Sequence, residues 1–206
     1  MKEIIEKIKE EISEIDEEIK SRFYEQEEPL TGRFLGILGD RLQRLNDEKY
    51  EIDTKIYGSR GRGAEENIIG ADFCIILKLK TKGRSYPKYF LSQAKKEIQK
   101  ENLRFDKNLR RQCRKMKRYT SDSFIFVYTP KGIFVKSSLN EELLFKDLPS
   151  FFEDFFKCFI GDIHPIPFWP FYPLSAKISW NKKELSKYIH ILEINIIEKI
   201  KDESTN

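Results

Sequence analysis

Three polar residues stand at the ends of two apolar segments of the chain. Asp72 lies near the start of ADFCIILKLK (71–80), and Gln93 and Lys95 lie at the end of YPKYFLSQAK (86–95). Both segments are typical of β-strands. Alternate residues of a strand share a face, so Gln93 and Lys95 point the same way. If the two strands pair, Asp72 lies beside them, and a glutamate from a helix, Glu27 or Glu28, can complete the group.

These residue types suit one kind of chemistry. Carboxylate and amide oxygens are hard ligands that favour Mg²⁺ or Mn²⁺, ions that bind proteins through few carboxylates together with phosphate oxygens. A bound ion of this kind polarises a phosphate and lowers the pKa of a coordinated water. Lys95 would hold the attacking water or offset the charge that develops on the phosphoryl oxygens. The group therefore predicts metal-dependent hydrolysis of a phosphodiester.

The Gln-x-Lys tripeptide alone is not specific. An Asp, Glu or Gln two positions before a lysine occurs four times, at Glu18, Asp47, Asp53 and Gln93. Asp53 is the main rival, because it also lies in a predicted strand, Tyr50 to Tyr57. Gln93 alone lies at the end of an apolar strand whose preceding strand begins with an aspartate. It is also the one followed at once by a basic segment. The context, rather than the tripeptide, selects Gln93.

Several runs around these residues resemble a known superfamily. EPLTGRFL at 28–35, GADF at 70–73 and LSQAKK at 91–96 resemble the PD-(D/E)xK, restriction-endonuclease-like nucleases. More narrowly, they resemble the branch with a Gln-x-Lys final motif, found in nuclease modules of bacterial anti-phage defence systems. QCRKMK at 112–117, leading into SFIFVYTPKGIFV, is similar to the same branch. The resemblance spans residues 25–138 and implies a mixed sheet flanked by helices, dependence on Mg²⁺ or Mn²⁺, and DNA cleavage, often by dimers or larger assemblies.

The resemblance also implies a role for each matching residue. It gives the catalytic group as Glu28, Asp72, Gln93 and Lys95, with the metal held by Glu28, Asp72, Gln93 and the backbone carbonyl of Ala94.

Two features depart from the usual pattern or leave it open. Gln93 stands where Glu or Asp is commoner, which removes one negative charge from the metal site. We expect this to weaken metal binding at rest and to tie activity to bound DNA or to assembly. Glu27 shares a helical register with Leu30 and Phe34, so it remains the alternative to Glu28 as the helix-borne ligand.

The charge of the chain is concentrated in one segment. The net charge is +4, but residues 1–28 hold 5 basic against 11 acidic side chains, and residues 78–118 hold 16 against 3. A basic block inside a folded segment indicates a polyanion partner, here DNA, although a solvated helix face would look the same. We expect a helix over 96–119 whose cations contact phosphates without reading sequence. The predicted nucleic-acid contacts are Lys96, Lys100, Arg104, Arg111, Lys115 and Arg118, with Arg60 and Arg62 from the loop GSRGRG.

The remaining pattern favours an α/β fold in a single domain, 1–206. It divides into an N-terminal amphipathic helix (1–25), a nuclease core (26–138) and a C-terminal helical and proline/aromatic portion (139–206). We expect two strands in 123–138, one or two short helices in 141–161, a proline/aromatic loop at 164–174, and a last amphipathic helix over 182–201. The N-terminal helix fits either packing within the domain or a dimer contact.

Composition narrows the function classes further. No apolar run approaches the roughly 20 residues that cross a bilayer, and the three cysteines form no CxxC pair, so neither a membrane protein nor a disulfide or zinc framework is indicated. We expect a cytoplasmic protein that binds DNA, self-associates and works with other defence subunits, with no membrane partner. The alternatives are a catalytically silent DNA-binding or scaffold protein that keeps the fold, and a helical module that binds an acidic protein.

Overall fold

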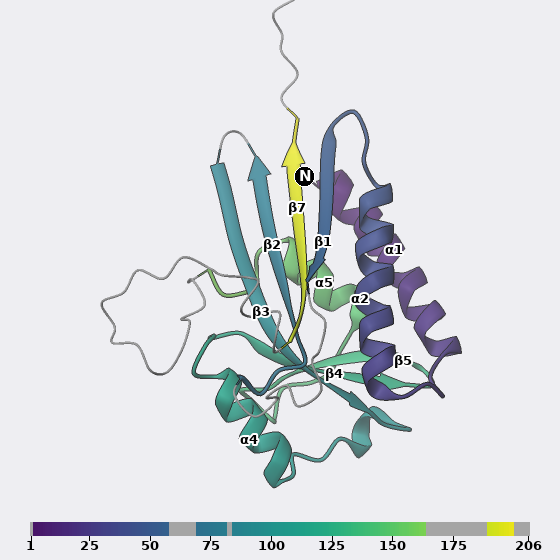
Figure 1. Ribbon diagram of the computed structural model, residues 1–206, viewed down its shortest axis with the longest axis vertical. Helices are drawn as coiled ribbons and strands as arrows, with labels where there is room; N and C mark the ends of the chain where they lie inside the picture. The colour runs from purple at the N-terminus through teal and green to yellow at the C-terminus, as the bar shows by residue number, and fades with distance from the viewer. Residues whose placement is uncertain (1, 58–68, 82–83, 164–188, 200–206) are drawn as a thin grey trace, which may run out of the picture.

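The computed structural model describes residues 2–57, 69–81, 84–163 and 189–199. They form a mixed α/β fold built on a seven-stranded sheet (Figure 1). In chain order the elements are α1 (Lys2–Ser21), α2 (Glu27–Arg44), β1 (Tyr50–Tyr57), β2 (Phe73–Thr81), β3 (Arg84–Lys96), a short 3-10 turn (Lys100–Asn102), α4 (Lys107–Met116), β4 (Ser123–Thr129), β5 (Gly132–Ser137), β6 (Lys146–Asp147), α5 (Leu148–Phe156) and β7 (His190–Glu198).

The sheet runs in the order β1-β7-β2-β3-β4-β5-β6. β2 and β3 are antiparallel, and β3 and β4 are parallel. Because parallel neighbours need a crossover connection, the chain leaves β3, forms α4 and returns to begin β4. β7 lies between β1 and β2, antiparallel to β1 and parallel to β2. The sheet therefore draws on both sides of the predicted boundary at residues 138/139.

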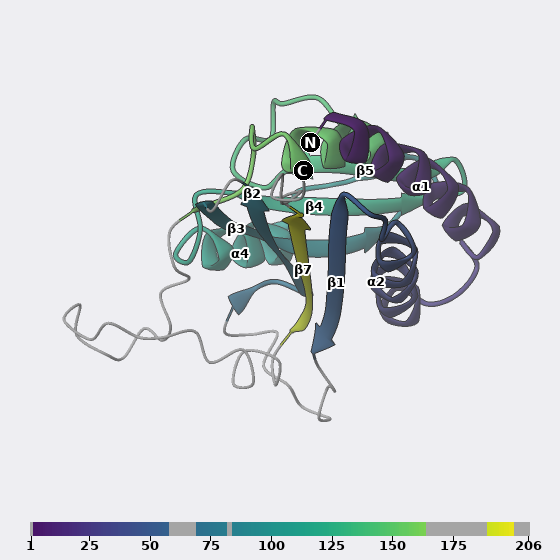
Figure 2. The same cartoon turned by 90° about the horizontal axis from the view of Figure 1, so that it is seen from above.

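One face of the sheet carries α1, α2 and α5 over a core rich in phenylalanine. The isoleucine stripe of α1 is buried in this core, as are the apolar positions of α2 and the phenylalanines of α5. Figures 1 and 2 show α1 beside α2 and α5, with α4 at the opposite side of the molecule. The predicted N-terminal amphipathic helix is confirmed. Its apolar stripe packs within the chain, so that stripe is not an exposed surface for a dimer.

The opposite face of the sheet carries α4 and a smaller core. Leu109, Cys113 and Met116 of α4 are buried there together with β-strand residues such as Leu91 and Ile125. The buried stripe of α4 packs against β-strand residues of this face, and this packing holds the helix near the polar ends of β2 and β3. The helix is thus positioned to present its basic residues close to those ends.

The helix predicted over 96–119 is wrong in its extent. β3 continues to Lys96, a 3-10 turn follows, and α4 begins only at Lys107. Asp106 sets this start, because its side chain accepts a hydrogen bond from the Leu109 N–H and satisfies a donor that the first helical turn leaves unpaired. Basic residues lie on both sides of Asp106, so the sequence pattern did not indicate that the helix begins there.

The helix predicted over 182–201 is wrong for residues 190–198, which form β7. Leu192, Ile194 and Ile196 alternate onto the phenylalanine-rich face, a period-two pattern that coexists in the sequence with the helical spacing. Strands on both sides pair with this segment, and β-branched residues suit such a position. Residues 182–188 and 200–201 lie outside the described residues, as do Arg60, Arg62 and the loop at 164–174. Between residues 141 and 161, α5 is the single α-helix.

None of the described helices is both long and apolar enough to cross a membrane.

Candidate functional site

Asp72 and Gln93 lie side by side at the end of the β2–β3 pair. Phe73 faces Ser92 across the two strands, and the Asp72 N–H donates to the Ser92 carbonyl at 2.8 Å. On the other side, the His190 N–H donates to the Asp72 carbonyl at 3.0 Å. The main chain of the aspartate is thus fixed by two strands, β3 and β7. Both side chains are buried, with 6% of Asp72 and 2% of Gln93 exposed.

The Asp72 carboxylate is the centre of a small hydrogen-bonded group. Its Oδ2 accepts from the Gln93 Nε2 and, at 2.8 Å, from the Ala94 N–H. The Gln93 Nε2 also lies 3.4 Å from the Ala94 carbonyl oxygen. Three of the four metal ligands predicted from the sequence, Asp72, Gln93 and Ala94, therefore meet in one buried place.

Lys95 projects from the end of the same strand and meets a glutamate of α2. Its Nζ lies 3.7 Å from the Glu27 Oε1, and the two side chains are 26% and 37% exposed. Glu28 is exposed at the next position around the helix. The register that buries Leu30 and Phe34 on the sheet turns Glu27 rather than Glu28 toward Lys95. Of the two glutamates left open by the sequence, the structure brings Glu27 to the lysine.

The buried Tyr128 shows that the two carboxylates share their surroundings. Burial raises the pKa of Tyr128, and the charges of Asp72 and Glu27 raise it further. Both carboxylates therefore lie within electrostatic reach of the same hydroxyl. Asp72 immediately precedes β2 and Glu27 is the first residue of α2, so the end of the sheet and the start of the helix converge, as the sequence-based hypothesis requires.

The donor set fits a hard divalent cation. Asp72 and Glu27 supply carboxylates, Gln93 an amide oxygen and Ala94 a main-chain carbonyl, and all-oxygen sets of this kind suit Mg²⁺ or Mn²⁺. Within the described residues, no three Asp, Glu, His or Cys side chains gather into a metal-binding group, so the set depends on the amide and the carbonyl. Because the Gln93 amide nitrogen now faces Asp72, that amide must turn to offer its oxygen to a cation.

Two of the predicted DNA contacts are engaged within the protein. The Lys96 Nζ donates to the Glu25 carbonyl at 2.7 Å and lies 4.5 Å from the ring centre of Phe23. It therefore holds the α1–α2 connection against the end of β3. The Lys100 Nζ lies 4.2 Å from the ring centre of Phe134 on β5.

A cavity of about 550 Å³ opens beside Lys95. Arg104, another predicted DNA contact, is exposed and lines this cavity together with the half-buried Glu97 and the exposed Asn102. The cavity gives the lysine an approach from solvent. Arg104 is thus the predicted contact that lines the same cavity as Lys95.

Three other predicted contacts form a row along α4 and just beyond it, named here the outer row: Arg111, Lys115 and Arg118. Burial lowers the pKa of Lys115, and the charges of Arg111 and Arg118 lower it further. The cations therefore repel one another, which favours binding an anion. Lys115 packs against Gly70, whose φ of +79° and approach to the Gln112 carbonyl, 2.4 Å from where a Cβ would stand, require glycine. The outer row thus lies beside the segment that leads into Asp72.

Comparison with known proteins assigns the chain to no family. No protein-family model matches the chain, and no curated protein matches it.

Proposed function

We propose that the chain is a metal-dependent DNA endonuclease of the restriction-endonuclease-like, PD-(D/E)xK type, with Mg²⁺ or Mn²⁺ as its cofactor. One observation carries the proposal: Asp72, Gln93 and Ala94 meet in a buried hydrogen-bonded group, and Lys95, two residues after Gln93, contacts a glutamate of α2. The mixed sheet with helices on both faces supports the same proposal, because the resemblance of the sequence to that superfamily implies such a sheet.

The residues have distinct tasks in this proposal. Asp72, Gln93, the Ala94 carbonyl and Glu27 would hold the metal, with Glu27 in the part that the resemblance assigns to Glu28. When bound, the metal supplies Lewis-acid polarisation of the phosphate and an acidified water. Lys95, partly exposed at its cavity, orients the attacking water or offsets charge on the phosphoryl oxygens. The Glu27 carboxylate, 3.7 Å from the Lys95 Nζ, also helps to hold that ammonium in place.

DNA is the proposed substrate because the outer row lies beside the segment that carries Asp72. Cations there would contact phosphates and align the strand without reading its sequence. Self-association, other defence subunits and a cytoplasmic location belong to the same proposal and rest on the resemblance.

A specific observation also favours a second candidate, a catalytically silent DNA-binding or scaffold protein. The Asp72 carboxylate already receives hydrogen bonds from the Gln93 amide and the Ala94 N–H. A buried carboxylate satisfied in this way needs no metal to offset its burial. The group is then a structural fastener at the end of the sheet, and only the cationic surface would be functional.

Plasmid cleavage with Mg²⁺ or Mn²⁺ separates the two candidates. Wild type is compared with Asp72→Ala and Lys95→Ala at several protein concentrations, and Asp72→Asn is added because it keeps the side-chain volume. Asp53→Ala and Lys55→Ala are the matched controls, since Asp53 and Lys55 form the other strand-borne acid-x-lysine tripeptide, an ion pair of 3.0 Å at the far side of the sheet.

The endonuclease proposal expects metal-dependent cleavage that the Asp72 and Lys95 variants lose and both controls keep. Cleavage that persists in Asp72→Ala and Lys95→Ala would refute the site. A wild type that binds DNA in a mobility-shift assay as tightly as Asp72→Asn, and never cleaves at any protein concentration, would support the silent candidate.

A further inference from the structure

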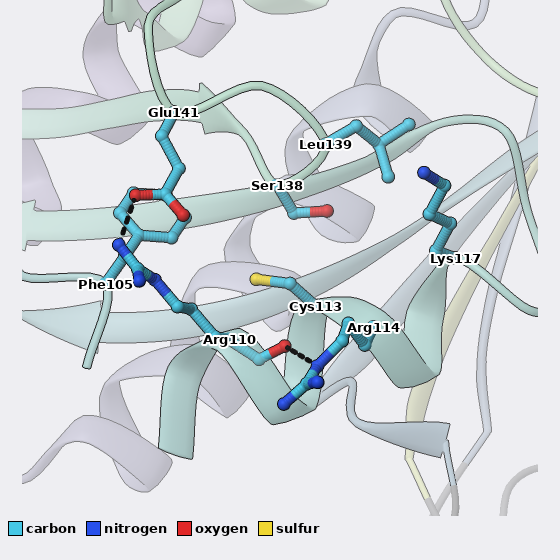
Figure 3. A pocket seen from close by; sticks show the side chains of 8 residues that line it. All are labelled: Phe105, Arg110, Cys113, Arg114, Lys117, Ser138, Leu139 and Glu141. Atoms are coloured by element: carbon cyan, nitrogen blue, oxygen red, sulfur yellow. Dashed lines mark hydrogen bonds and ion pairs between the residues drawn. The ribbon is translucent and has the colours of Figure 1, made fainter. Parts of the chain in front are cut away.

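A second cavity, of about 360 Å³, lies between α4 and the segment that follows β5 (Figure 3). α4 and its C-terminal end contribute a second basic row, named here the pocket row: Arg110, Arg114 and Lys117. The opposite wall comes from Ser138, Leu139 and Glu141, and Phe105 lies at the end near Glu141. This volume falls within the usual range of small-molecule sites, roughly 300–1,000 Å³.

The charges of the cavity are unequal. Arg110 donates to the Glu141 carboxylate at 2.9 Å, an ion pair that joins α4 to the facing segment. The Arg114 guanidinium donates to the Arg110 carbonyl at 3.3 Å. Within the described residues, neither Arg114 nor Lys117 has an acidic partner. Two uncompensated cations at one cavity favour an anionic ligand such as a phosphate. Figure 3 draws their charged ends on different sides of the cavity, with the Lys117 ammonium near Leu139.

The other walls suit a flat, partly apolar group. Phe105 and Leu139 supply apolar surface near the two ends of the cavity, with the Ser138 hydroxyl and the Cys113 thiol between them. Burial raises the pKa of the Cys113 thiol to about 11, so at neutral pH it is a neutral wall rather than a nucleophile. An aromatic ring and a phosphate on one small molecule would use both kinds of surface.

We infer that this cavity binds a single nucleotide, with its base against Phe105 at one end, its phosphate at Lys117 near Leu139 at the other, and Arg114 adding positive charge to the wall between them. Aromatic side chains accept bases of any sequence by stacking. The nucleotide comes either as a free molecule or as one unit of a nucleic-acid strand. The charge of Lys95 lowers the pKa of Cys113, so the cavity lies within electrostatic reach of the candidate site. A strand that passes Lys95 is one source of such a unit, and binding here does not depend on cleavage.

The test measures binding with metal chelated by EDTA. The probes are adenosine monophosphate carrying a fluorescent N-methylanthraniloyl group and a short 5′-phosphorylated oligonucleotide labelled at its 3′ end. Arg114→Gln/Lys117→Gln removes the two uncompensated cations. Both side chains are exposed, so we expect this variant to fold, and its circular dichroism spectrum checks that it does. Arg111→Gln/Arg118→Gln is the matched control, because it removes the same charge from the outer row of the same helix.

We expect the Arg114→Gln/Lys117→Gln variant to bind the probe at least tenfold more weakly than wild type, a loss of about 1.4 kcal/mol. The Arg111→Gln/Arg118→Gln control should bind the labelled nucleotide within about twofold of wild type. Dependence on Arg114 and Lys117 seen with the mononucleotide identifies a free ligand. The same dependence seen only with the oligonucleotide identifies a strand. Adenosine should compete poorly with the labelled nucleotide.

The inference is overturned if neither probe depends on Arg114 and Lys117 more than on Arg111 and Arg118. The pocket row would then serve only the C-terminal dipole of α4, which cations stabilise. Since no cleavage is measured, a protein without nuclease activity can still pass this test, and an active nuclease can fail it.

Discussion

The two faces of the sheet bury different kinds of side chain. The face under α1, α2 and α5 is filled by aromatic rings, with Phe124 and Phe151 at 4.8 Å and Phe90 and Phe155 at 4.9 Å between ring centres. The α4 face is smaller and accommodates buried polar groups, among them Glu193, which accepts from Lys78 at 2.6 Å. The first face supplies most of the apolar burial. It also buries Lys88, whose Nζ lies 4.3 Å from the ring centre of Phe155 and donates to the Ile160 carbonyl at 2.9 Å.

The end of the sheet belongs to both faces. Gln93 and Lys95 alternate with Ala94, whose side chain joins the aromatic core, while α2 reaches from the aromatic side to bring Glu27 to Lys95. A buried polar group costs free energy unless it is hydrogen-bonded, and Asp72 and Gln93 meet this condition through each other. The comparison thus predicts that stability and activity can be lost separately.

The largest effect should come from breaking the aromatic face. Phe152→Ala removes a fully buried ring that contacts Phe34, Phe90 and Phe151, and we expect unfolding to become easier by about 3–5 kcal/mol. Urea unfolding measures this loss. Cleavage per folded molecule should stay unchanged, since the ring does not touch the candidate site. A large fall in that specific rate would mean that the two faces are coupled.

The next effect concerns the glutamate that α2 contributes. Glu27→Gln removes the carboxylate beside Lys95, and we expect the cleavage rate to fall about 10–100-fold, as for residues that support a metal site. Glu28→Gln, the neighbouring exposed change, should cost less than about twofold. Single-turnover rates of both variants measure the difference. A reversed order would restore Glu28 to the part that the resemblance assigns to it.

The sequence predicted the grouping of Asp72, Gln93 and Lys95 at one end of the sheet better than it predicted the elements around them. Asp72, Gln93 and Lys95 were found because strand alternation and the β2–β3 pairing are local, separated by one short connection. β7 was missed because its identity as a strand comes from β1 and β2, which are more than a hundred residues away along the chain. Residue propensity cannot decide between helix and strand for this segment, because its isoleucines fit both the helical and the strand period.

The assignment of the glutamate shows the limit of motif spacing. The spacing of EPLT favours Glu28, whereas the burial of Leu30 and Phe34 turns Glu27 inward. Helical register was the better physical signal, because a helix must bury its apolar stripe. The cavity beside the pocket row could not be predicted, since Ser138 and Glu141 meet α4 only in the folded chain.

A smaller effect should separate the cations that bind DNA from those that hold the fold. Arg111→Gln/Arg118→Gln should weaken DNA binding and reduce the slope of log affinity against log salt by about 2, because each phosphate contact contributes roughly 0.9. Lys96→Gln should leave the slope unchanged, since its ammonium already binds the Glu25 carbonyl and the Phe23 ring. Filter binding over a salt series measures both. Equal slopes for wild type and both variants would show that the outer row does not contact DNA phosphates.

The smallest effect should be a pH dependence of the stability of the fold, through an ion pair at the edge of the aromatic face. Glu153 of α5 accepts from Lys157 and, at 2.6 Å, from Lys9 of α1, and these contacts lower its pKa to about 2. A carboxyl whose pKa is lower in the folded state stabilises the fold above its unfolded value of 4.5, and this contribution is lost as the pH falls from there toward 2. Wild type should therefore lose more thermal stability across this window than Glu153→Gln, while Glu10→Gln, an exposed change on α1, follows wild type. Since the pair is solvent-accessible, added salt should shrink the difference. Parallel acid profiles for wild type and Glu153→Gln would show that apolar packing alone joins α1 to α5.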